Sequence, residues 1–232
     1  MAEDWGYQLN NEVLHKLVDV RDRFVVDVGC GAGELCVNLA EHGARVLGVE
    51  PDPVQSRKNA TAKTVANVGF VQAGAADMPL EPASVDGVIF SNSLHHIHAP
   101  HYEQVFAEVM RVLKSHGWLY VKEPIANGSH NYVMSLFHDE TEVRLAAYNA
   151  LLKYALPNFG KSREIYYDVD TTYRNFDEFA GRYEGLSYNS YNKAAVRDSK
   201  VQSRFEEQAN SHGSFTLTQP MRVNVYGLPR YS

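Results

Sequence analysis

Three glycines at alternate positions follow a short β-branched run near the start of the chain. Residues 24–28 suit a buried parallel strand, and Gly29, Gly31 and Gly33 come directly after it. Glycines there let the backbone turn sharply and approach a ligand where any Cβ would intrude. Apolar residues at helical spacing follow from Leu35, so a helix begins beside the glycines with its free N–H groups facing the loop. Strand, glycine turn and helix together predict a nucleotide-type site at the carboxyl end of a parallel strand.

The spacing of the glycines argues against a dinucleotide ligand. Dinucleotide sites use the pattern G-x-G-x-x-G, which would require a glycine at position 34. The third glycine stands at 33 instead, and Glu34 puts a carboxylate where a pyrophosphate would lie on the helix end. Asp27 adds another acid two residues before the first glycine. Acidic groups in this position favour a ligand that has a cationic end.

Three more predicted strands end beside residues that suit the same ligand. Residues 44–50 form a strand that ends in Glu50, and an acid at that tip can accept hydrogen bonds from both hydroxyls of a ribose. Residues 68–72 form the next strand, followed by small residues and Asp77. Residues 85–90 form the fourth and lead into a polar turn. Helical segments alternate with these strands, which predicts a doubly wound parallel sheet.

The segment from Asp27 to Gly33, with the pattern D-x-G-x-G-x-G, closely resembles the first motif of the class I S-adenosylmethionine-dependent methyltransferases. The three later strand ends resemble the family's next motifs, in the same order, and the resemblance extends to about residue 125. It implies a Rossmann-like α/β fold: a seven-stranded, mostly parallel sheet flanked by helices, with an antiparallel last strand and a helical, aromatic cap inserted after strand five. The implied cofactor is S-adenosyl-L-methionine, and the implied activity is methyl transfer.

The same resemblance assigns cofactor contacts residue by residue. It implies that Glu50 accepts from the ribose hydroxyls and that Asp77 accepts from the adenine amino group. Asp27 orients the glycine loop or meets the ammonium end of the cofactor, and the two roles are compatible. The expected cofactor-binding residues are Asp27, Gly29, Gly31, Glu50, Pro51, Ala76, Asp77 and Asn92.

The 232 residues are expected to form a single methyltransferase domain, since this length can bury one sizeable core. Residues 1–124 form the cofactor-binding half, residues 125–214 a substrate cap, and residues 215–232 the closing strands. The cap is rich in tyrosine, and aromatic faces can hold a methylammonium group or stack on a planar ring. Most of these tyrosines are expected to build the cap's own small core. They are Tyr132, Tyr148, Tyr154, Tyr166, Tyr167, Tyr173, Tyr183, Tyr188 and Tyr191.

Histidines after the fourth strand are the candidate catalytic residues. His95 and His96 stand where cofactor and acceptor meet in the family, and an imidazole needs little tuning to act as a base near neutral pH. His95 is preferred, because the motif's loop should turn that position towards the cleft. The alternative is that the pair packs or hydrogen-bonds to fix its own loop. His98 and His101 extend the set, but no acid or cysteine stands at ligand spacing along the chain, so no metal is expected.

Two further features have open alternatives. Glu123 ends strand five at the edge where open α/β sheets bind ligands, and it either faces the substrate or pairs with Lys122 or a cap residue. Trp5 and Tyr7 precede the first predicted helix, residues 10–20. They either close over the cofactor, as N-terminal aromatics often do in the family, or simply pack.

Charge and composition narrow the choice of acceptor. The chain carries 22 Lys+Arg against 28 Asp+Glu, a net charge of −6, and lacks the basic footprint of a nucleic-acid binder. A small-molecule acceptor is therefore expected, with nitrogen or oxygen slightly favoured and no nucleic-acid partner. The alternatives are a tRNA or protein methyltransferase, a non-catalytic S-adenosylmethionine-binding protein and a nicotinamide-dependent enzyme.

The start of the chain is acidic, and no apolar run reaches the length of a membrane span. No leader and no membrane partner are expected, and the predicted location is cytoplasmic. The oligomeric state is left open.

Overall fold

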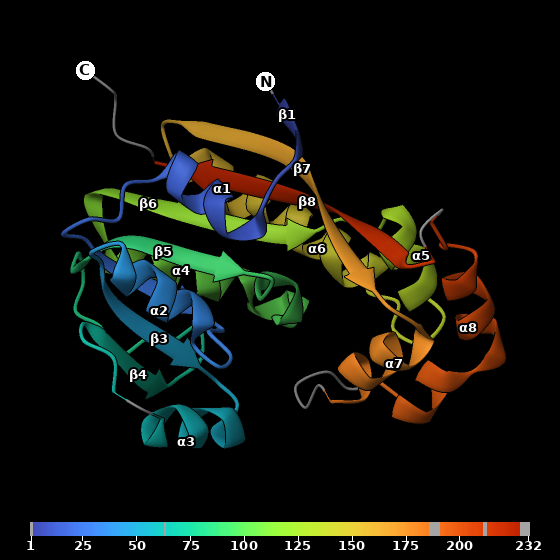
Figure 1. Cartoon of the computed structure of the whole chain (residues 1–232). Helices are drawn as coiled ribbons and strands as arrows, with labels where there is room; N and C mark the ends of the chain where they lie inside the picture. The colour runs from blue at the N-terminus through green and yellow to red at the C-terminus, as the bar shows by residue number, and fades with distance from the viewer. Residues whose placement is uncertain (1, 63, 186–190, 211–212, 228–232) are drawn as a thin grey trace.

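A single eight-stranded sheet carries the fold, in the order β1-β7-β8-β6-β5-β2-β3-β4 (Figure 1). The structure, a computed structural model, describes residues 2–62, 64–185, 191–210 and 213–227. The predicted Rossmann-like α/β class is confirmed, with one strand more than expected. The strands are β1 (Ala2–Tyr7), β2 (Phe24–Val28), β3 (Arg45–Glu50), β4 (Val68–Gln72), β5 (Val85–Ser91), β6 (Leu113–Pro124), β7 (Ser162–Tyr173) and β8 (Phe215–Tyr226).

The parallel half of the sheet is built around β2. This strand pairs in parallel with β3 on one side and β5 on the other, so the backbone groups of Val25–Val28 are paired on both edges. Val25, Val26 and Val28 are buried, because helices cover both faces of the sheet there. The carboxyl ends of β2, β3 and β5 therefore meet at one edge, which is where the glycine turn begins.

Strand β8 reverses the direction of the chain within the sheet. It runs antiparallel to β6 over Leu119–Pro124 and antiparallel to β7 along the whole length of β7, which confirms the expected reversal of the last strand. The sequence suggests an exposed strand near residues 164–173. Instead β7 is paired on both sides, by β1 and β8, and Ile165, Tyr167 and Tyr173 are buried.

The additional strand is β1, which pairs in parallel with β7 at the far edge of the sheet. Trp5 belongs to this strand; its indole N–H donates to Glu3, and the guanidinium of Arg163 lies 5.8 Å from its ring centroid. Four strands separate β1 from β2, so Trp5 is distant from the glycine loop and packs instead. Tyr7 ends the strand and is 66% exposed.

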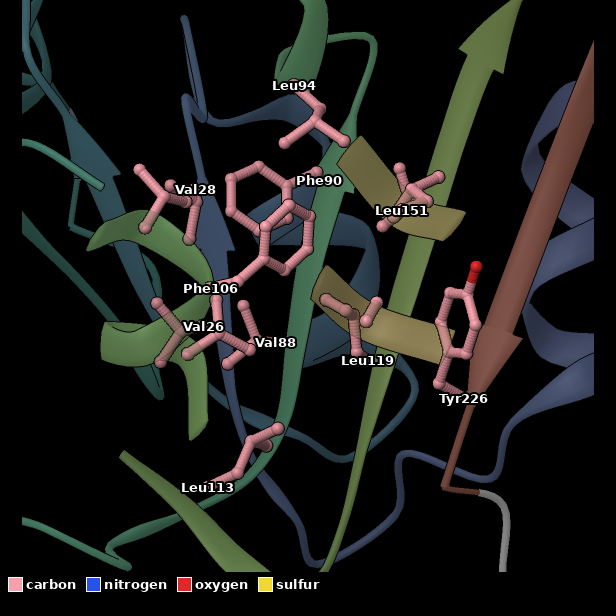
Figure 2. Close-up of a cluster of buried hydrophobic side chains, with 14 of the residues drawn as sticks. Val26, Val28, Val88, Phe90, Leu94, Phe106, Leu113, Leu119, Leu151 and Tyr226 are labelled. Atoms are coloured by element: carbon pink, nitrogen blue, oxygen red, sulfur yellow. The ribbon is translucent and has the colours of Figure 1, made fainter. Parts of the chain in front are cut away.

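Helices cover both faces of the sheet. On one face, α1 and α2 pack on a cluster that includes Val13, Leu39 and Tyr120. On the other, α4, α6 and the π-helical turn that follows α6 pack Phe106 and Leu151 against β5 and β6, as Figure 2 shows. The helices are α1 (Asn10–Leu17), α2 (Glu34–Glu41), α3 (Pro53–Thr61), α4 (Tyr102–Val112), α5 (Gly128–Met134), α6 (Thr141–Ala150), α7 (Phe176–Glu184) and α8 (Ser199–Glu206). Within the described ranges, no helix has the length and hydropathy needed to cross a membrane.

A third apolar cluster lies beyond the carboxyl ends of β5 and β6, where α5, α7 and α8 gather (Figure 1). Tyr173 and Tyr183 are buried in it with Phe179 and Phe205, so at least these tyrosines build the cap's own core. The range 125–214 is not a cap alone, because it also contains β7, which belongs to the main sheet. Its role as a substrate cap stays a prediction, and Tyr188 lies outside the described residues.

Candidate functional site

The glycine turn after β2 has the backbone geometry that the sequence requires. Gly29, Gly31 and Gly33 have φ of 72°, 53° and 79°, in the left-handed region that L side chains rarely adopt. A Cβ at Gly29 would lie 2.7 Å from Ser93 Cβ, and a Cβ at Gly33 would lie 2.5 Å from the Phe70 ring. At Gly31 a Cβ would meet nothing within 4 Å. Two of the glycines therefore permit close packing, and the third borders open space.

Glu50 joins this turn to the end of β3. Its side chain is buried, and its two carboxylate oxygens accept hydrogen bonds from the backbone N–H groups of Gly31 (2.8 Å) and Asp52 (2.9 Å). Each oxygen keeps a second lone pair, because a carboxylate offers about four acceptor sites. Open space beside Gly31 and a fixed carboxylate next to it fit the ribose of a nucleoside cofactor. The assignment of Glu50 to the ribose hydroxyls remains a prediction.

Asp27 lies beneath the turn, on β2. Its carboxylate is 2% exposed and accepts from the Cys36 thiol at 3.4 Å. Burial raises the pKa of Asp27 to about 6, although the Cys36 hydrogen bond and the charge of Lys122 oppose the rise. Burial also lowers the pKa of Lys122 to about 8, against the attraction of Asp27. This buried position favours support of the glycine loop over direct contact with a cofactor.

The other predicted cofactor residues lie at the same edge of the sheet. Pro51 is exposed directly after β3, and Asp77 is exposed after β4 with the half-buried Ala76 beside it. Asn92 follows β5 with φ of 57° and donates its backbone N–H to the Lys122 carbonyl at 2.8 Å. The fold thus brings together side chains from four strand ends, and their contacts with a cofactor stay predictions.

The acceptor end of the predicted site contains a buried imidazole held between two acids. His95 lies in a short helical turn (Leu94–His96) after β5 and is 5% exposed. Its Nδ1 is hydrogen-bonded to Glu123 Oε2, and the other oxygen of Glu123 accepts from the Leu94 N–H at 2.9 Å. Its Nε2 lies 3.5 Å from Glu140 Oε1. Of the alternatives for Glu123, the structure supports pairing, with a partner other than Lys122.

Glu140 reaches this turn from the segment that precedes α6. Its Oε2 accepts from Arg144 Nη2 at 2.7 Å, and its Oε1 lies 2.9 Å from His138 Nε2. Asn131 accepts from the other guanidinium nitrogen of Arg144 at 3.2 Å. The cap segment and the end of β6 therefore meet in one buried polar cluster around His95.

The two candidate catalytic histidines differ in environment. Burial by itself lowers the pKa of His95, but the nearby carboxylates of Glu123 and Glu140 outweigh it and raise the pKa to about 9. For His96, desolvation of part of the ring and the neighbouring His95 lower the pKa. His95 is engaged through both nitrogens, whereas His96 is exposed, with its ring centroid 4.1 Å from that of His95. If one of the pair is a general base, this geometry favours His96.

The sequence missed the acid that joins the histidines, because that acid lies far along the chain. The expectation of no metal rested on the lack of an acid near the histidines in sequence, and the fold supplies Glu140 instead. His95, His96 and Glu140 each offer one atom that could bind a metal ion, and these three atoms lie within 4.8 Å of one another. His98 and His101 are exposed and stand outside this group.

Comparison with known proteins places these features in a family. A domain family described as "Methyltransferase domain" matches residues 26–121. An uncharacterized methyltransferase of Mycobacterium leprae is 34% identical over 95 residues, which are 41% of this chain and 35% of that protein. The tRNA U34 carboxymethyltransferase of Cellvibrio japonicus is 28% identical over 136 residues (56% of this chain, 41% of that protein), and the O-methyltransferase rstn1 of Aspergillus nomiae is 27% identical over 144 (59% and 63%).

Structural similarity to known proteins covers more of this chain than sequence similarity does. The crystal structure of the YcgJ protein from Bacillus subtilis superposes with a TM-score of 0.64 at 20% identity, covering 93% of this chain and 97% of that one. The chain spans about a third of the length of the mycobacterial relative. Residues 26–121 therefore form a methyltransferase domain, and its D-x-G-x-G-x-G turn and strand order are consistent with the class I S-adenosylmethionine-dependent methyltransferases.

Proposed function

We propose that this chain transfers the methyl group of S-adenosylmethionine to a small-molecule acceptor, with a nitrogen or oxygen atom favoured. The main support for cofactor binding is the open space beside Gly31, which lies next to the fixed carboxylate of Glu50. The bound cofactor would supply a sulfonium that makes its methyl carbon electrophilic. The chain then has to hold the cofactor, align the acceptor and exclude water, and positioning alone can supply about 7–11 kcal/mol in favourable cases.

We assign roles to the site residues from the family resemblance, and their positions at one edge of the sheet are compatible with it. Glu50 would hold the ribose hydroxyls, and Asp77 would accept from the adenine amino group. Gly29 and Gly31 would lie against the methionine and ribose portion. The polar cluster around His95 stands at the ends of β5 and β6, where the acceptor would approach. His96, the exposed member of the pair, is the histidine that can reach a bound acceptor.

The choice of a small molecule rests on charge. A net charge of −6 gives no basic footprint for a polynucleotide backbone. A tRNA acceptor is the rival reading, since one relative acts on tRNA by its name. Two further alternatives are a protein acceptor and cofactor binding without methyl transfer.

The test is a turnover screen of the full chain against a metabolite library, a tRNA pool and a cell-extract protein fraction. The readout is S-adenosylhomocysteine formed above the no-acceptor background, at a low cofactor concentration at which Glu50→Ala should show reduced turnover. We expect turnover with one or a few small amines, heteroaromatics or phenols. Turnover only with tRNA or protein would overturn the small-molecule proposal. No turnover with any acceptor, together with tight cofactor binding, would favour a non-catalytic cofactor-binding protein.

A further inference from the structure

We propose that the histidine cluster at the acceptor end binds a divalent cation, Zn²⁺ by its donor set, through His95 Nε2, an imidazole nitrogen of His96 and Glu140 Oε1. The donors come from the turn after β5 and from the segment before α6. Two imidazoles and one carboxylate form a set that suits zinc and related transition metals better than Mg²⁺ or Ca²⁺. The proposal goes beyond methyl transfer and does not depend on it.

The spacing of the donors fits a shared cation. Zinc–nitrogen and zinc–oxygen bonds of about 2.1 Å place neighbouring ligand atoms about 3.0–3.4 Å apart. His95 Nε2 lies 3.5 Å from Glu140 Oε1, which is long for a hydrogen bond between a buried imidazole and a carboxylate. The nearest donor atoms of all three residues lie within 4.8 Å of one another, so small side-chain rotations close the site.

The surrounding groups orient the donors as outer partners of metal sites do. Glu123 binds His95 Nδ1, which places the ring proton there and leaves the Nε2 lone pair directed at Glu140. Arg144 donates to Oε2 of Glu140 at 2.7 Å, so Oε1 is the oxygen that faces His95 and His138. A histidine that gives one nitrogen to a buried carboxylate and the other to a metal is a recurrent arrangement.

His138 is a second, independent observation at the same oxygen. Its side chain is 15% exposed, and its Nε2 lies 2.9 Å from Glu140 Oε1. That nitrogen is buried without a hydrogen-bond partner of suitable geometry. A cation beside Oε1 would accept its lone pair as a further donor. Since His96 is exposed, the remaining coordination position would face outward, as in metal sites that bind a substrate.

The competing explanation needs no cation. An imidazolium at His95, shared between Glu123 and Glu140, would also satisfy the buried acids. That network gives His96 no part, because His96 contributes no ion pair to it. Loss of the His96 ring therefore separates the two explanations. With a cation present, the lone pair of an acceptor could bind the metal, which would lower the acceptor's pKa and make the histidines ligands in place of a base.

The experiment measures zinc binding to the untagged full chain after chelator treatment and dialysis, by calorimetry and by elemental analysis. Cobalt absorption reports the coordination. We expect one zinc per chain, and at least about tenfold weaker binding in His96→Ala and Glu140→Gln. His98→Ala, an exposed neighbour in the same segment, and His42→Ala, whose ring stacks on His15 at 3.8 Å, are the matched controls and should bind as the parent does.

Three results would overturn the proposal. They are less than one zinc per chain, unchanged affinity in His96→Ala, and loss of binding in His42→Ala, which would place the ion at the His15 stack. Glu140→Gln leaves Arg144 without its anion and can fail to fold, so thermal unfolding is recorded for every variant. His96→Ala then decides the outcome, because this side chain is exposed. No cofactor or acceptor is present, so the result is independent of the turnover screen.

Discussion

Replacement of Glu50 by Gln separates two roles of one carboxylate. The side chain is 8% exposed and accepts backbone N–H groups of Gly31 and Asp52 at 2.8 and 2.9 Å. An amide keeps one acceptor oxygen, and its NH₂ group faces the other backbone donor. One buried N–H therefore loses its acceptor, which costs about 1–3 kcal/mol. The substitution should therefore cause a measurable loss of stability.

The same substitution removes one charged acceptor for the ribose. A hydrogen bond to a charged group contributes about 1.5–3 kcal/mol, so S-adenosylhomocysteine should bind roughly 10- to 100-fold more weakly. Urea unfolding measures the first effect and calorimetry the second. Glu34→Gln is the control, because Glu34 is an exposed acid at the same turn. Unchanged affinity would refute the ribose assignment, and unchanged stability would refute the anchoring of the turn.

Three further outcomes are expected. Gly33 has a φ of 79°, and a new Cβ there would lie 2.5 Å from the Phe70 ring, so Gly33→Ala should lower the free energy of unfolding by about 2 kcal/mol or more. A Cβ at Gly31 would meet no atom within 4 Å, so Gly31→Ala should cost about 1–2 kcal/mol and chiefly weaken cofactor binding. Equal losses of stability in the two variants would contradict the close packing of Gly33 against Phe70. The pKa of Asp27 in the folded chain is raised to about 6, so its protonated form stabilises the fold below about pH 4, and this contribution is lost as pH rises through 6. Without cofactor, the free energy of unfolding of Asp27→Asn should therefore gain about 3 kcal/mol relative to that of the parent between pH 4 and 8. A difference between the two proteins that stays constant with pH would argue against the raised pKa. His96→Ala should lower kcat by about 10²–10⁴ with little change in cofactor affinity, and a fall below tenfold would reduce His96 to a positioning role.

The sequence predicts those strands of the sheet whose structure is determined by the pattern of neighbouring residues. The strands at residues 24–28 and 68–72 coincide with β2 and β4, because β-branched runs bounded by glycine or polar turns leave little choice. Strand β1 was missed, since its alternation is weak and its partner among the described strands is β7, about 160 residues later in the chain. Pairing over that distance leaves no local signal. The extended pairing of β7 with both β1 and β8 was missed for the same reason.

The site residues also fall into those that local sequence pattern predicts and those that only tertiary packing brings together. Glu50 and the glycines were found because they stand at strand ends in a recognisable spacing. Glu140 and His138 were not, because they precede α6 and meet His95 only through the packing of that helix on the sheet. Acid–imidazole contacts between segments some 45 residues apart cannot be read from spacing, yet they fix the environment of both histidines.

A crystal structure of the chain with S-adenosylhomocysteine would show where the cofactor binds. We expect one molecule at the carboxyl edge of β2 and β3, with both ribose hydroxyls in hydrogen-bond range of Glu50 and the adenine between Ala76 and Asp77. Its sulfur should face the turn that carries His95 and His96. A cofactor bound elsewhere, or a ribose without contact to Glu50, would contradict the proposed site.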